Sequence, residues 1–197
     1  DVMNKQREII YGQRKQVLDG MDVKGIIMNM MNGAISNLVN AAFVGAEHLD
    51  MAACRDLLRS VEGVYFPKYT VKLDEQQLRT MTQQDFTDLF TEAAADYYAK
   101  KEAEITPPVM RELERVILLR VVDEYWMEHI DAMQDLRQGI RLRAYAQTNP
   151  VDAYKKESLE MFEEMVEAMK EETVRRLYSV RLRQNEEVKR ERVASGI

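Results

Sequence analysis

Apolar residues recur along most of this chain at steps of three and four positions, which is the spacing of an amphipathic α-helix. We expect long helices at 1–18, 23–46, 82–105, 109–137 and 152–180. Asp22 is a suitable N-cap for the second of these. Shorter helices are predicted to follow Asp50 and to lie near 74–79, while 63–73 is the one β-like or irregular stretch. The pattern therefore predicts an all-α fold.

The last two long helices are predicted to form an antiparallel hairpin, because a short linker joins them. At about 1.5 Å per residue, the first of the two would span roughly 42 Å. Gly139 is expected to mark one side of the turn. Asn149 can cap the returning helix, and Pro150 suits its first turn.

Composition agrees with long helices and few turns. The 197 residues include only 8 glycines and 4 prolines, and these are the residues that most turns require. Hydrophobic residues make up 46%, too many for a disordered chain. Pro107 and Pro108 forbid continuation of the helix before them, so we expect a stiff junction there.

Charge and cysteine content exclude further classes of partner and site. The net charge of −6 argues against bulk attraction to nucleic acid, so no nucleic-acid partner is expected. Cys54 is the only cysteine, which leaves no internal disulfide or thiolate metal cluster and is compatible with a reducing compartment. No apolar run is long enough to cross a membrane. The helical pattern is already present at Asp1, without an initiator methionine, so we expect a piece of a longer protein.

Motifs of catalysis are missing from the sequence. It contains no phosphate-binding loop, no dinucleotide fingerprint and no nucleophile elbow. His129 lies among helical acids, but a metal site needs several convergent ligands, so a packed or hydrogen-bonded histidine is expected. Trp126 is expected to anchor helix packing. Methionines at 28–31 and 161–169 suit a core, or else an adaptable surface for apolar partners.

The linker of the hairpin has an unusual composition for a simple connector. No acidic residue lies between Asp135 and Asp152. Apolar residues alternate there with arginines: Ile140, Leu142 and Tyr145 with Arg137, Arg141 and Arg143. Exposed apolar residues at a tip lower solubility. The residues alone leave open a bare linker, or a contact surface for an extended polypeptide, an acidic lipid surface or an RNA backbone.

The same segment carries a resemblance to a known family. Residues 136–150, LRQGIRLRAYAQTNP, resemble the two-helix finger of SecA, the bacterial preprotein translocase motor. The flanking stretches 122–133 and 154–162 resemble the family's adjoining helices. Residues 1–11 resemble the start of its long scaffold helix.

The resemblance implies an arrangement of parts. Residues 1–47 would be the first part of a helical scaffold, and 48–107 an inserted helical wing. Residues 108–180 would be the second part of the scaffold, with the finger tip at about 138–151, and 181–197 would be a charged tail.

The resemblance also implies a function. The tip, with Tyr145 at the position of the family's tip tyrosine, would contact the translocating chain at the SecYEG channel. The other contact residues would be Ile140, Leu142, Arg141 and Arg143, with Gly139, Asn149 and Pro150 as turn residues. The expected partners are a preprotein or signal-sequence polypeptide, SecYEG, the nucleotide-binding domains of SecA and anionic phospholipids.

The chain itself would be a non-catalytic part of a protein-translocating ATPase, with no catalytic residue, metal or cofactor of its own. ATP and Mg would bind to the nucleotide-binding domains that this sequence lacks. The expected location is the cytoplasm and the cytoplasmic face of the bacterial membrane. The alternative is a free-standing helical adaptor that binds partner proteins as a coiled coil.

Overall fold

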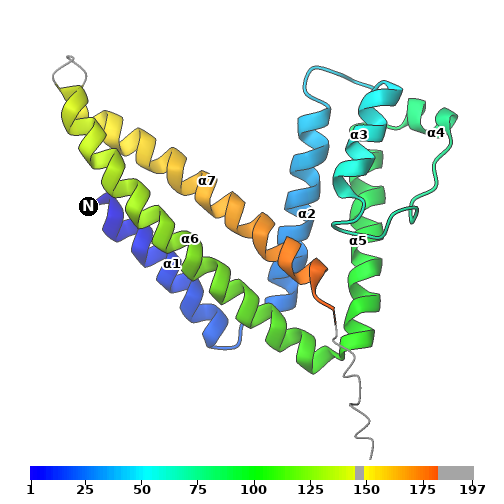
Figure 1. The fold of residues 1–197 in the computed structure, drawn as a ribbon, viewed down its shortest axis with the longest axis horizontal. Helices are drawn as coiled ribbons and strands as arrows, with labels where there is room; N and C mark the ends of the chain where they lie inside the picture. The colour runs from blue at the N-terminus through cyan, green and yellow to red at the C-terminus, as the bar shows by residue number, and fades with distance from the viewer. Residues whose placement is uncertain (145–148, 182–197) are drawn as a thin grey trace, which may run out of the picture.

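The computed structural model describes residues 1–144 and 149–181 (Figure 1). These ranges contain seven helices: α1 Val2–Leu18, α2 Val23–Ala42, α3 Met51–Val61, α4 Glu75–Thr80, α5 Gln83–Ile105, α6 Pro107–Arg143 and α7 Pro150–Ser179. They contain no strand. Residues 63–73 are irregular, and Phe66 within them forms an isolated bridge with Glu62. The all-α prediction is confirmed.

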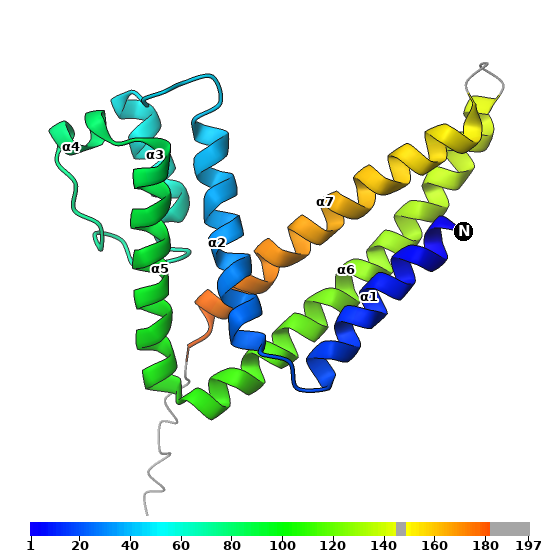
Figure 2. The same cartoon turned by 180° about the vertical axis from the view of Figure 1, so that it is seen from behind.

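The helices form two arms that diverge from a common base (Figures 1 and 2). In one arm α6 and α7 form the predicted antiparallel hairpin, and α1 lies along it. In the other arm α2 packs against α3 and α5. None of the helices in the two described ranges has the length and apolar character needed to cross a membrane.

A tight corner separates α1 from α2. Gly20 adopts a φ of +92°, a left-handed conformation that glycine reaches without steric cost. The Met21 N–H donates to the Gln16 carbonyl over 3.2 Å, and the Asp22 carboxylate accepts the Gly25 N–H as the predicted N-cap. At its far end α2 stops at Ala42, earlier than the predicted 46, and Gly45 is again left-handed.

The first hairpin helix is longer than predicted. Pro107 and Pro108 occupy the first turn of α6, where no helical N–H is needed, and Thr106 turns the chain with a φ of +89°. At its other end α6 continues to Arg143, so its 37 residues span about 56 Å. The prediction that Gly139 marks the turn is wrong, because Gly139 lies inside the helix.

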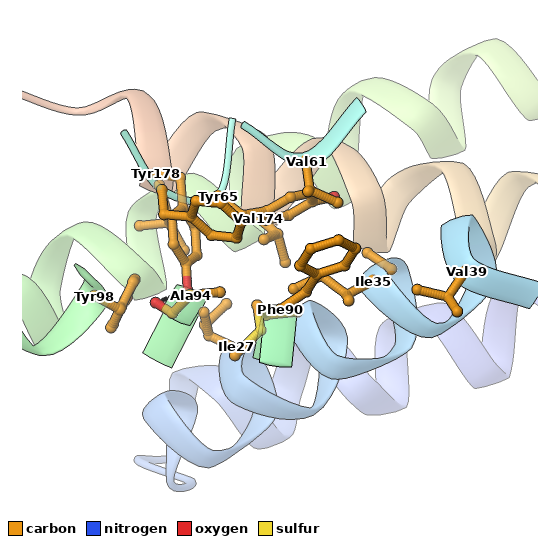
Figure 3. Close-up of a cluster of buried hydrophobic side chains, with 14 of the residues drawn as sticks. Ile27, Ile35, Val39, Val61, Tyr65, Phe90, Ala94, Tyr98, Val174 and Tyr178 are labelled. Atoms are coloured by element: carbon orange, nitrogen blue, oxygen red, sulfur yellow. Dashed lines mark hydrogen bonds between the residues drawn. The ribbon is translucent and has the colours of Figure 1, made fainter. Parts of the chain in front are cut away.

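Two apolar cores lie along the molecule. The stem core joins α1 to the middle of α6 and α7 through Met3, Ile10, Val121, Trp126, Met133, Met165 and Met169. The wing core joins α2, α3 and α5 to the base of the hairpin. Ten of its buried residues are labelled in Figure 3: Ile27, Ile35, Val39, Val61, Tyr65, Phe90, Ala94, Tyr98, Val174 and Tyr178. The scaffold and wing boundaries at 47 and 107 stay predictions, and α2 packs into the wing core.

Candidate functional site: the hairpin, its tip and its supports

The returning helix of the hairpin begins as the sequence predicts. The Asn149 side chain accepts the Val151 N–H over 3.1 Å, and its amide donates to the Asp152 carboxylate over 2.8 Å. Pro150 is the first residue of α7, where its missing N–H costs nothing. These contacts fix the direction in which α7 leaves the tip.

The predicted contact residues at the tip lie in different environments. Leu142 is 73% exposed, and Arg141 is also exposed. Ile140 is only 6% exposed, so its assignment as an exposed contact residue is wrong. The reason is that α6 continues past Gly139 and its helical turn carries Ile140 to the buried side. Tyr145 belongs to 145–148, which lie outside the described residues.

Arg143 is engaged within the hairpin. Its Nη1 and Nη2 donate to Glu157 Oε1 and Oε2 over 2.7 and 2.9 Å, which joins the end of α6 to α7. These bonds hold the pKa of Glu157 below its ordinary value and that of Arg143 above it. A two-point pair fixes the orientation of both side chains. Arg143 stays 56% exposed within this pair, and its role as a contact residue stays a prediction.

A buried amide holds α1 in the hairpin. Gln6 Nε2 donates to the Ser158 carbonyl of α7 over 3.1 Å. Its Oε1 therefore accepts from His129 Nε2 of α6, at 2.8 Å. His129 packs against the Trp126 and Phe162 rings, and burial lowers its pKa. One side chain thus joins three helices, and His129 is packed and hydrogen-bonded as the sequence predicts.

A second group of polar residues lies where the wing rejoins the hairpin. We call it the junction cluster: Lys24, Tyr98, Glu102, Arg111 and Glu114. The Glu114 side chain is fully buried and accepts from Tyr98 Oη at 2.7 Å and from Arg111 Nη2 at 2.8 Å. Arg111 Nε also lies 2.8 Å from Glu114 Oε2, as an ion pair without hydrogen-bond alignment.

The junction cluster extends to α2 through Glu102. That carboxylate accepts from Arg111 and from Lys24 Nζ, the latter over 3.0 Å. Burial acts to raise the pKa of Glu102, but the bonds from Lys24 and Arg111 outweigh it and hold that pKa below its ordinary value. Burial and the bond to Glu114 raise the pKa of Tyr98.

Sequence reasoning missed the junction cluster, although one signal was present. Glu114 lies four residues after Met110 and four before Leu118, both buried, so an acid stands on the apolar stripe of α6. An acid at such a position requires partners from other helices.

The methionines of the two predicted clusters lie in the two cores or pack against them. Met31, Met165 and Met169 are buried in the two cores. Met30 and Met21 line a cleft of about 420 Å³ between α1, α2, α6 and α7. Most of these side chains therefore fill the interior rather than form a surface.

Comparison with known proteins gives one consistent result. The SecA Wing and Scaffold domain family matches residues 1–181. The protein translocase subunit SecA of Clostridium novyi is 44% identical over 194 residues, which are 98% of this chain and 23% of that protein. The same subunit of Clostridium acetobutylicum is 46% identical over 180 residues, 91% of this chain and 21% of that protein.

The Clostridium kluyveri subunit is 43% identical over 197 residues, all of this chain and 23% of the relative. The chain thus spans less than a quarter of the length of these curated relatives. The range that matches the family contains the hairpin, the stem core and the junction cluster. The chain belongs to the SecA Wing and Scaffold domain family.

Proposed function

We propose that this chain is the wing and scaffold part of a protein-translocating ATPase, and that its hairpin tip contacts the polypeptide in transit at SecYEG. The relatives named as protein translocase subunits support this proposal. The remaining proposed partners are the nucleotide-binding domains, which would hold ATP and Mg, and anionic phospholipids. The proposed location is the cytoplasm and the cytoplasmic face of the membrane.

The observation that carries the proposal is the braced, projecting end of the hairpin. The ends of α6 and α7 that lead to the tip extend beyond the N-terminus of α1 (Figure 1). Leu142 and Arg141 are exposed there, while the Arg143–Glu157 pair and the Gln6 contacts support the helices behind them. An apolar and a cationic side chain on a firm support suit contact with a polypeptide of variable sequence.

The adaptor alternative requires an apolar seam on α7 that a partner helix could cover. Most of that seam is already packed, because Met165 and Met169 lie in the stem core and Leu177 in the wing core. No observation favours the adaptor over the translocation proposal.

Site-specific photo-crosslinking tests the proposal in a full-length SecA relative that carries this segment. A photoreactive residue replaces Leu142 at the tip, and a preprotein is arrested during translocation. Leu159 supplies the matched control, because it is an exposed leucine at 56% on α7, about 14 Å along the helix from Pro150. We expect crosslinks to the preprotein from position 142 and not from 159. Equal crosslinking at the two positions would refute a tip contact.

A further inference from the structure

The C-terminal end of α7 is held by a buried lysine from the wing arm. Lys101 of α5 is 6% exposed, and its Nζ donates to the Tyr178 carbonyl and, over 2.6 Å, to the Val180 carbonyl. The last carbonyls of a helix have no partner within it, and a cation is favourable at this end. Glycine or asparagine often completes such an end, but Val180 and Arg181 follow α7 here. The cap therefore comes from another helix.

The contact between α5 and α7 runs in both directions. Tyr178 Oη of α7 donates to the Ala94 carbonyl of α5 over 2.8 Å, and Figure 3 shows this hydroxyl directed towards Ala94. The Tyr178 ring packs against Tyr98 at 5.2 Å and Tyr65 at 5.7 Å. Each helix thus donates a hydrogen bond to the backbone of the other.

We propose that Lys101 is a positioning residue that fixes the angle between the hairpin and the wing arm by capping α7, so that the hairpin tip follows the wing. This inference rests on the proposed function for its role in transport. The angle determines where the tip-side end of α7 lies, because a rotation of about 10° at the base would move the far end of this roughly 45 Å helix by about 8 Å.

A purely space-filling role for Lys101 predicts a different effect of substitution on this angle. A buried amine requires hydrogen-bond acceptors, and the two α7 carbonyls supply them. If the side chain only filled space, methionine would replace it without effect on the angle. If the cation holds α7, arginine retains the contact and methionine loses it.

Pulsed electron–electron spin resonance on the 197-residue chain separates these roles. Spin labels go on Arg59→Cys of α3 and Glu160→Cys of α7, both exposed. Buried Cys54 is replaced by alanine in every variant, so that only the introduced cysteines carry labels. The variants are Lys101→Met and Lys101→Arg, with exposed Lys100→Met on the same helix as the matched control.

We expect Lys101→Met to broaden the distance distribution. Residue 160 lies roughly 28 Å along α7 from its base, so each 10° of angular freedom there adds about 5 Å to the width. Lys101→Arg and Lys100→Met should keep the width of the parent chain. Parent-like width in Lys101→Met, or equal broadening in Lys101→Met and Lys101→Arg, would overturn the proposal.

A second variant covers the case in which Lys101→Met does not fold. Lys101→Gln keeps a polar side chain at the buried position but removes the cation that donates to the two α7 carbonyls. It should broaden the same distribution, and an unchanged width in this variant would also overturn the proposal. The measurement needs no transport machinery. Parent-like widths would therefore overturn the positioning role and leave the tip contact untouched, whereas equal crosslinking at positions 142 and 159 would refute the tip contact and leave the positioning role standing.

Discussion

Arg111→Met probes how strongly the junction cluster holds the two arms together. The substitution keeps most of the aliphatic volume and removes the cation that faces Glu114 and Glu102. Glu114 is fully buried, and among the described residues the Tyr98 hydroxyl would be the one hydrogen-bond donor left to its carboxylate. The variant therefore leaves a buried charge without its counter-ion.

The expected loss follows from that geometry. Removing one partner of a buried ion pair costs about 3–5 kcal/mol of unfolding free energy. Arg111 is itself 32% exposed and the Tyr98 bond remains, so we expect the lower end, about 3 kcal/mol. The double variant Arg111→Met, Glu114→Leu should recover part of this loss, because no buried carboxylate at position 114 then lacks a partner.

Urea unfolding of the chain, followed by circular dichroism at the helical band, measures these free energies by linear extrapolation. Arg115→Met is the matched control, because Arg115 pairs with the exposed Glu112 on the same helix and its loss should change the free energy by less than about 0.5 kcal/mol. If Arg111→Met costs no more than Arg115→Met, the buried junction does not stabilise the fold and the reasoning fails.

Three further predictions concern single residues. Gly139→Ala should stabilise the chain by about 0.5–1 kcal/mol, because the site is helical and an added Cβ meets nothing within 4 Å; a lower urea midpoint would contradict this. Gly20→Ala should instead destabilise it by about 1 kcal/mol or more, since its φ is +92°, and thermal melting of the two variants checks the opposite signs. Glu102 has a lowered pKa, so its stabilising contribution is present above its unfolded pKa and is lost as pH falls through the folded value. As the pH falls from about 6 to about 3, the Glu102→Gln variant should therefore lose less unfolding free energy than the parent chain. Equal losses, measured by urea unfolding at each pH, would refute this.

Local signals predicted the starts of several helices well. Asp22, Asp50 and Thr82 each accept a backbone N–H from the first turn that follows, and Asn149 does the same for α7. A cap depends on residues within three or four positions of one another, so a sequence contains all of the information it needs.

Contacts between distant helices could not be predicted in this way. Gln6 contacts His129 and Ser158, which lie 123 and 152 residues away, and Lys101 reaches the α7 backbone 77 residues on. Such contacts depend on the register between helices, which a single sequence does not specify. The error at Ile140 has the same origin. Its burial depends on the continuation of α6 past a glycine, and helix propensity alone disfavours that continuation by about 1 kcal/mol.

The passage of α6 through both cores has a consequence for folding. Val121 and Met133 of this helix belong to the stem core, and Met110 and Leu118 belong to the wing core. When one end of a helix unfolds, the hydrogen bonds next to it are lost in turn. Each core therefore depends on the other to keep the backbone of α6 helical. We therefore expect the stem core and the wing core to unfold together, in a single transition by every probe.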